Sequence, residues 1–87
     1  MKTRYYILQD LPGKRHFVRT EDGEAFLQFD NEQEACAYAS WLAENFTWAD
    51  YVVKQRRTYD KQGPGLGILF FENFEEVKRF PKTGLSL

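Results

Sequence analysis

The chain has very few of the side chains that most often carry chemistry. Its 87 residues include one cysteine, Cys36, and one histidine, His16. A single cysteine cannot form a disulfide within the chain, which excludes a small secreted domain held together by disulfides. A zinc site needs several converging His, Cys or carboxylate ligands. We therefore expect no metal and no other cofactor.

A catalytic centre is equally hard to assemble from these residues. A cysteine nucleophile needs a base within hydrogen-bond reach, and the sole histidine falls on a different predicted element from Cys36. The glycine-rich segment 63–67 precedes a predicted strand, whereas phosphate-binding loops of that kind lead into a helix. We therefore predict that the protein is not an enzyme, and a small enzyme of unknown reaction is kept as one alternative.

Long apolar runs are also absent near the beginning of the chain. Residues 1–10 contain an apolar run of only four residues, at 5–8. A signal peptide needs an apolar segment of about 7 to 15 residues, and a membrane helix needs about 20. We therefore expect a cytoplasmic protein that does not associate with a membrane.

Basic residues are missing from the middle of the chain. Residues 20–53 contain no Lys or Arg but eight Asp or Glu, whereas both flanking segments carry more basic than acidic residues. The formal net charge of −1 conceals this segregation. Either basic strands neutralise an acidic helix within the molecule, or an acidic face attracts a basic partner. The sequence leaves both interpretations open.

Aromatic residues, by contrast, are abundant, with eight Phe, five Tyr and two Trp. Each large ring buries roughly 150 to 250 Å², so the chain can build one core without disulfides or metals. A second core would have too little apolar surface. We predict a single domain over residues 1–87, with 82–87 as a flexible tail.

The first half of the chain predicts three strands and a long helix. Residues 5–8, 16–20 and 25–29 are rich in β-forming types, and turn signals separate them at Pro-Gly and Asp-Gly. From Asn31 to Phe46 the apolar spacing becomes helical. Asp30 or Asn31 can cap this helix, with Gln33 or Glu34 closing a capping box. Ala35, Tyr38, Ala39, Leu42 and Phe46 follow this spacing, and the predicted buried face comprises Ala35, Ala39, Leu42 and Phe46.

The second half predicts two more strands and a short helix. Residues 51–59 read as a long fourth strand, and 66–71 as a fifth strand buried on both sides. Asn73 then begins a predicted short helix with Phe74, Val77 and Phe80 on one side, ended by Pro81.

A short sequence motif occurs twice, at residues 27–35 and again at residues 69–77. Each copy has an apolar run, an acid, an Asn and a carboxylate three residues later, which is typical of a strand leading into a capped helix. Either a ββα unit is used twice or capping alone selects these residues. The predicted fold is α+β, with a mainly antiparallel sheet of about five strands in the order β-β-β-α-β-β-α.

The candidate functional surface lies on the long helix. Trp41 is rotated by about 120° from the predicted buried face, at 100° per residue. An exposed Trp among small and acidic residues is typical of an interface hot spot. We therefore predict an adaptor-type or inhibitor-type module that binds another protein or itself. The predicted contact residues are Trp41, Ala37, Tyr38, Glu34 and Glu44. The competing possibility is that the second helix covers Trp41.

The alternative partner is single-stranded nucleic acid, bound through the fourth strand. Basic side chains interleaved with aromatic rings can contact phosphates and stack on bases. The residues of this alternative are Lys54, Arg56, Arg57 and Tyr59. Strand alternation divides their charge between two faces, and an exposed edge strand carries similar charges simply to prevent aggregation.

Overall fold

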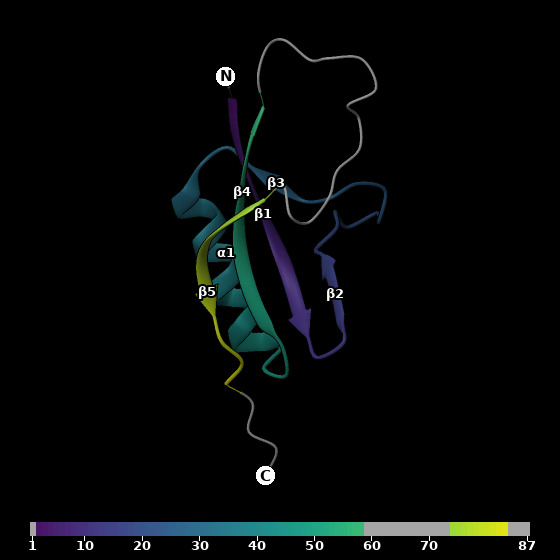
Figure 1. Cartoon of the computed structure of the whole chain (residues 1–87). Coiled ribbons are helices and arrows are strands. Elements are labelled where there is room, and N and C mark those ends of the chain that lie inside the picture. Colours follow the sequence, from purple (N-terminus) through teal and green to yellow (C-terminus); the bar gives the residue numbers. More distant parts are fainter. Residues whose placement is uncertain (1, 59–73, 84–87) are drawn as a thin grey trace.

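The computed structural model describes residues 2–58 and 74–83 (Figure 1). Their elements are β1 (Lys2–Leu11), β2 (Lys14–Phe17), β3 (Gln28–Phe29), α1 (Glu32–Asn45), β4 (Asp50–Thr58) and β5 (Glu75–Phe80). The class is α+β, as predicted, with five strands and one helix. The predicted strand 66–71 and the residue Tyr59 lie outside the described residues.

All strand pairs in the sheet are antiparallel. Its order is β2-β1-β4-β5, and β4 pairs with β1 over the whole length of β4, from Lys2↔Thr58 to Asp10↔Asp50. The other edge of β1 is shared: β2 pairs with its C-terminal half and β3 with Tyr5 and Tyr6. β1 is therefore the central strand onto which the N-terminal half of the protein folds.

The second and third strands, which the Asp-Gly turn predicts to pair antiparallel, do not pair with each other, because β2 and β3 both pair with β1. Only a short hairpin is present in the chain between them. Arg19 and Phe26 form an isolated antiparallel bridge, and the Thr20 N–H donates to the Ala25 carbonyl at 2.8 Å. Gly23 lies at φ +74°, a conformation that glycine adopts without steric cost. β2 and β3 are short because the chain on both sides of this turn also pairs with β1.

The predicted C-terminal helix is wrong, because residues 75–80 form strand β5. Val53 pairs with Lys78 and Lys54 with Glu76, so Val77 is an extra residue in a β-bulge. Because of the bulge, Val77 and Phe80 both pack on the core beneath α1, although they are three residues apart in the sequence. The same spacing is typical of residues on one face of a helix. The repeated ββα unit is therefore also wrong, because its second helix is a strand.

α1 covers one face of the sheet, and its underside is made almost entirely of alanine (Figure 1). Its buried residues are Ala35, Ala39, Leu42 and Ala43. Together with Ala49 they pack on Ile7, Tyr51 and Val53 of the sheet. Small side chains at this interface allow the helix backbone to lie close to the strands, within a densely packed interior.

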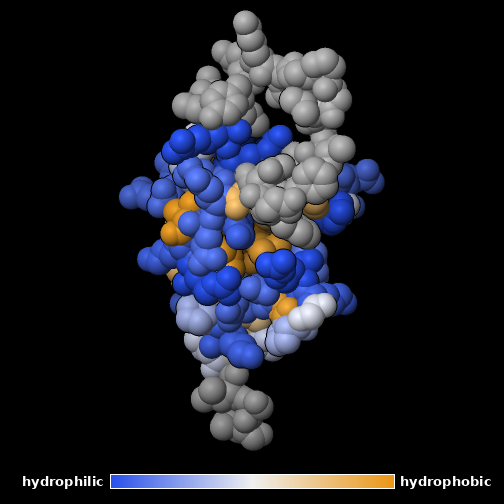
Figure 2. All heavy atoms as spheres, viewed as in Figure 1, coloured by the Kyte–Doolittle hydropathy of each residue, from blue (hydrophilic) through white to orange (hydrophobic). Residues whose placement is uncertain are grey.

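The opposite face of the sheet carries a second apolar cluster. Its buried residues are Tyr6, Leu8, Phe17, Val52 and Phe74, with Phe26 packed against them. The ring centroids of Phe17 and Phe74 are 4.8 Å apart, and those of Tyr6 and Phe74 are 5.2 Å apart. Figure 2 shows this face, where apolar surface lies among hydrophilic side chains. The sheet is thus packed on both sides.

Candidate functional site

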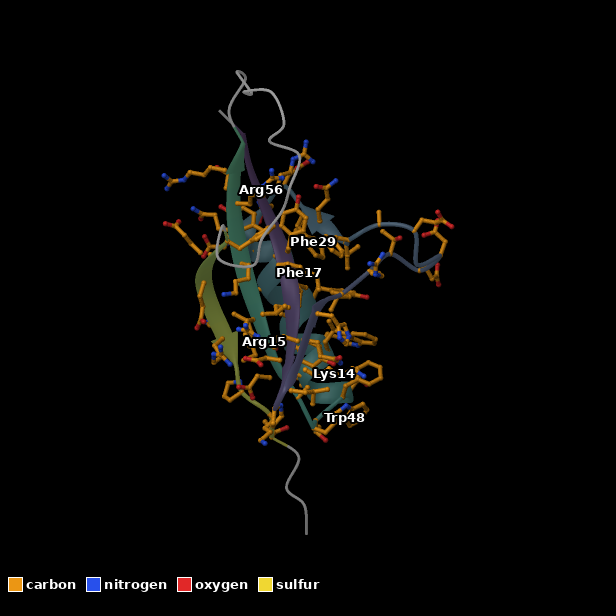
Figure 3. All side chains as sticks on the ribbon, turned by 45° about the vertical axis from the view of Figure 1, so that its right-hand side comes forward. Lys14, Arg15, Phe17, Phe29, Trp48 and Arg56 are labelled. Atoms are coloured by element: carbon orange, nitrogen blue, oxygen red, sulfur yellow. The ribbon has the colours of Figure 1, made fainter. Side chains whose placement is uncertain are left out.

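Five aromatic rings form a continuous row along the outside of α1 and the segments next to it. This aromatic row consists of Phe29, Tyr38, Trp41, Phe46 and Trp48. Its successive ring centroids lie 5.7, 5.8, 6.4 and 5.5 Å apart. In Figure 3 the two ends of the row, Phe29 and Trp48, lie apart along the length of the molecule. Each ring therefore contacts its neighbour, and the row crosses three segments of the chain.

Four of these rings are strongly exposed. The exposed fractions are 37% for Tyr38, 51% for Trp41, 37% for Phe46 and 55% for Trp48. Scattered single apolar residues are normal on a protein surface, whereas contiguous apolar patches mark interaction sites. The contacts between these rings make the row one patch.

The two ends of α1 account for the position of the rings. The Asn31 side chain accepts a hydrogen bond from the Glu34 N–H at 3.1 Å, so Asn31 is the N-cap, as predicted. At the other end the Phe46 N–H donates to the Leu42 carbonyl at 2.7 Å. Phe46 itself has φ −127° and ψ 81°. It therefore leaves the helical path, and its ring lies beside Trp41 instead of underneath the helix.

The predicted contact residues all lie at the surface. Ala37, Tyr38, Trp41, Glu34 and Glu44 are exposed, and Tyr38 stacks on Trp41 at an interplanar angle of 27°. The segment predicted as a second helix is β5, so it is not a helix lying over Trp41. Phe46 was predicted to be buried; this is wrong, because its side chain is exposed and its ring lies beside Trp41.

Sequence reasoning missed three members of the row, namely Phe29, Phe46 and Trp48. Phe29 was assigned to a strand and Phe46 to the buried face of the helix. Trp48 lies in the turn between α1 and β4. A tryptophan in a short polar turn was a usable signal, since large rings in turns seldom serve the core.

The acidic middle of the chain is only partly neutralised. Asp30 pairs with Arg4 at 3.4 Å, and Asp50 pairs with Arg79 at 2.8 Å. α1 contains three carboxylates and no Lys or Arg. Within residues 2–58 and 74–83, none of these three has an ion-pair partner. The helix that carries the rings therefore presents uncompensated negative charge at Glu32, Glu34 and Glu44.

A pocket of about 310 Å³ lies next to the aromatic row. It is lined by Gln9, His16, Phe17, Val18, Arg19, Leu42, Phe46 and Tyr51. Phe46 belongs to both the pocket and the row. The pocket lies between the C-terminal half of α1 and the β2 side of the sheet, and Phe46 connects it to the row.

The described residues of the nucleic-acid alternative do not share one face. Lys54 and Arg56 lie on the face opposite α1, and Arg57 points to the other face because strand residues alternate. Arg4 pairs with Arg56 in the register, which adds a base. Tyr6, Phe17 and Phe74 on that face are buried, so they are not available for stacking on a base. Tyr59, the ring named in this alternative, lies outside the described residues, and the alternative stays a prediction.

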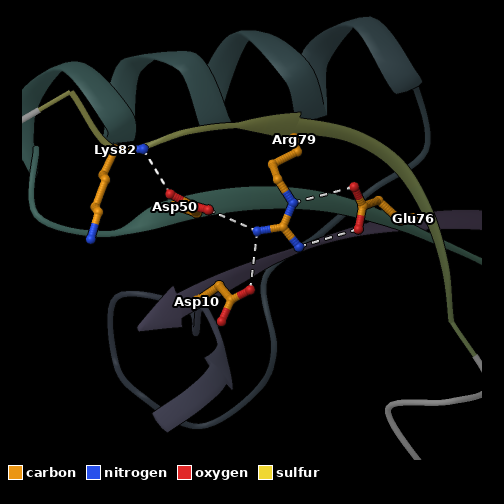
Figure 4. A network of polar contacts seen from close by, with 5 residues as sticks. All are labelled: Asp10, Asp50, Glu76, Arg79 and Lys82. Atoms are coloured by element: carbon orange, nitrogen blue, oxygen red, sulfur yellow. Dashed lines mark hydrogen bonds and ion pairs between the residues drawn. The ribbon is translucent and has the colours of Figure 1, made fainter. Parts of the chain in front are cut away.

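The best-connected polar cluster is structural (Figure 4). Asp10 and Asp50 are direct partners on β1 and β4, and two carboxylates in such positions repel each other. Arg79 donates to both, at 3.1 and 2.8 Å, and also to Glu76. The Lys82 N–H donates to Asp50 at 2.7 Å. Arg79 thus makes four hydrogen bonds and joins three strands.

Reactive chemistry finds little support in the described part of the chain. Burial raises the pKa of the Cys36 thiol, and the charge of Glu32 raises it further. A raised pKa is the opposite of what activates a thiol nucleophile. Residues 2–58 and 74–83 contain no cluster of three potential metal ligands.

No helix in the described part of the chain is long and apolar enough to cross a membrane. Comparisons of the chain with protein-family models, with curated protein sequences and with solved structures found no match.

Proposed function

We propose that this protein is a non-enzymatic, adaptor-type or inhibitor-type module that binds a basic protein surface through its aromatic row. The observation that carries the proposal is the row itself: five rings, each in contact with the next, four of them exposed. The row runs along a helix whose three carboxylates have no ion-pair partner among residues 2–58 and 74–83. The core accounts for none of this exposure, since α1 packs on the sheet through other residues.

The energetics of interfaces support this use of the rings. Tryptophan and tyrosine are enriched among the few residues whose truncation weakens binding by about 2 kcal/mol or more. They provide large contact areas with only two rotatable side-chain angles, so little conformational entropy is lost on binding. Two exposed Trp and one exposed Tyr in contact therefore supply the elements of a hot spot.

The charge around the row favours a partner other than a second copy. In a two-fold symmetric dimer the same patch meets itself, so the carboxylates of one α1 would face those of the other. Like charges across an interface are unfavourable, whereas Lys and Arg on a partner would complement Glu34 and Glu44 and accelerate association. We therefore commit to a basic partner, with apolar side chains that cover the rings.

Selection from a random peptide library tests this proposal. Peptides that combine Lys or Arg with apolar residues should be enriched, and their affinity should fall as salt rises. Trp41→Ala should weaken the enriched peptides at least tenfold, since about 1.4 kcal/mol corresponds to a factor of ten. Gln33→Ala, an exposed change on the same helix, is the matched control. Enrichment of acidic peptides, or equal affinity for the Trp41 variant, would contradict the proposal.

A further inference from the structure

The pocket beside Phe46 contains polar groups that the aromatic row does not use. His16, Gln9 and Tyr51 occupy directly paired positions on β2, β1 and β4. They therefore lie in one line across the sheet, on the face that α1 covers. The Gln9 Nε2 donates to the Tyr51 hydroxyl oxygen at 2.8 Å. This polar line contributes to the lining of the pocket.

This arrangement leaves one donor and one acceptor side by side. Tyr51 is 2% exposed, and its hydroxyl accepts from Gln9, so its own proton is still available. The amide oxygen of Gln9 has no hydrogen-bond donor among residues 2–58 and 74–83. No buried side-chain nitrogen or oxygen among the described residues lacks a hydrogen-bond partner, so this oxygen is reached by solvent, and a ligand that covers it must replace its bond to water. The floor of the pocket thus offers a donor and an acceptor together.

Apolar side chains form much of the pocket lining and limit what can enter. Val18, Leu42 and Phe46 contribute to it, and the polar side chains of His16 and Arg19 line it as well. Pockets for small molecules span about 300 to 1,000 Å³, so a volume of about 310 Å³ suits a single ring and not a larger cofactor. The occupant that matches these walls is one aromatic ring carrying one polar group.

We propose that this pocket receives a tyrosine side chain of the partner protein, with its ring against Phe46 and its hydroxyl at the Gln9–Tyr51 pair. This inference rests on the proposed function, since it assigns an anchor residue to the same partner. A phenol hydroxyl both donates and accepts, so it can donate to the Gln9 oxygen and accept from Tyr51.

Other large side chains satisfy the pocket less well. The indole of Trp only donates, so the Tyr51 proton would remain without an acceptor. Phe would bury both polar groups without any partner, and sites built to bind a hydroxyl discriminate against analogues that lack it. A Lys side chain brings a charge that neither Gln9 nor Tyr51 compensates. Tyrosine is therefore the matching residue.

The test uses two soluble probes, N-acetyl-tyrosinamide and N-acetyl-phenylalaninamide, added to the full chain. Amide chemical shifts of Gln9, His16 and Val18 should move with the tyrosine probe. Its affinity should exceed that of the phenylalanine probe about 3- to 10-fold, the range that one or two net hydrogen bonds provide. Equal affinities, or shift changes that avoid these residues, would overturn the inference.

Variants locate the preference within the pocket. Gln9→Met keeps the length of the side chain and removes its polar atoms, so the tyrosine preference should disappear while weak binding of both probes persists. Lys14→Ala, an exposed change on β2 outside the pocket lining, should keep the preference. If Gln9→Met does not give the amide spectrum of a folded protein, His16→Ala serves as the second pocket variant. The inference is overturned if His16→Ala keeps the full tyrosine preference and the amide chemical shift of Gln9 does not move with the tyrosine probe.

The same experiment separates this inference from the proposed function. Trp41→Ala should weaken library peptides without changing the tyrosine preference, because Trp41 does not line the pocket. Peptide binding that depends on Trp41 with no tyrosine preference would overturn the pocket assignment alone. A tyrosine preference with peptide binding that ignores Trp41 would overturn the role of the row alone.

Discussion

At the scale of single residues, Arg79 is the side chain on which most polar contacts converge. It bridges Asp10 and Asp50, which face each other across β1 and β4. Its pKa is raised above its usual value, chiefly by the hydrogen bonds with Glu76 and then by those with Asp50 and Asp10. Without the guanidinium, two adjacent carboxylates would repel each other.

We expect Arg79→Met to lower the free energy of unfolding by about 1 kcal/mol at pH 7, a modest value because the side chain is partly exposed. The pKa of Asp50 is lowered by the Lys82 N–H and by Arg79. A carboxyl group whose pKa is lower in the folded than in the unfolded protein stabilises the fold at pH values above its unfolded-state pKa of about 3.9. This stabilisation is lost as the pH falls through the folded-state pKa. The loss in the variant should therefore shrink below about pH 4.

Urea unfolding at pH 7, 5 and 3 measures this difference. Lys82→Met is the matched control, since it removes a nearby positive charge but keeps the backbone N–H that Asp50 accepts. A deficit for Arg79→Met that is as large at pH 3 as at pH 7 would mean that the cluster acts through packing and not through charge.

At the scale of elements, α1 combines an underside of small residues with bulky rings on its outer side. Ala35 and Ala39 are fully buried against the sheet, whereas Ala37 is exposed. The helix therefore approaches the sheet closely, and an added side chain at the contact has no space.

This geometry predicts opposite outcomes for the same substitution at two positions of α1. Ala39→Leu should destabilise the protein by about 1 to 3 kcal/mol, because overpacking forces the helix away from the strands. Ala37→Leu should change stability by less than about 0.5 kcal/mol, as is usual for surface positions. Thermal and urea unfolding compare the two variants, and equal losses would place the contact face of α1 elsewhere.

The elements also show what the sequence could predict. β1, β4 and α1 were predictable, because their patterns are local: alternating β-formers, a Pro-Gly turn, and a helix capped by Asn31. β5 was not, since the bulge at Val77 shifts its apolar residues to a three-residue spacing that looks helical. Only the pairing with β4, a contact distant in sequence, determines its structure.

The candidate site was also predictable only where local sequence patterns determine it, and not where residues distant in the sequence meet. Helical spacing was sufficient to place Trp41 and Tyr38 at the surface. It could not place Trp48, Phe46 or Phe29 beside them, because these lie on other segments and meet only in three dimensions. The pocket was likewise unpredictable, since its polar line depends on the register of three strands.

At the scale of the whole molecule, α1 presents three carboxylates without an ion-pair partner among residues 2–58 and 74–83, while Asp10 and Asp50 are paired on the sheet. We expect the protein to remain monomeric near neutral pH and low salt, because pairing two such helices would bring like charges together. Light scattering over a range of protein concentrations measures this, with 0.5 M salt as the comparison. A dimer at low salt that is lost in Trp41→Ala would show that the row binds a second copy.

The alanine underside of α1 also separates two kinds of evolutionary change. Because Trp41 and Trp48 are mostly exposed, replacing either alters the proposed binding surface with little effect on folding. If the surface of the partner changes by mutation, the exposed residues of α1 can change with it while Ala35 and Ala39 are kept. This is the behaviour of a scaffold on which new recognition surfaces can be selected without first regaining stability.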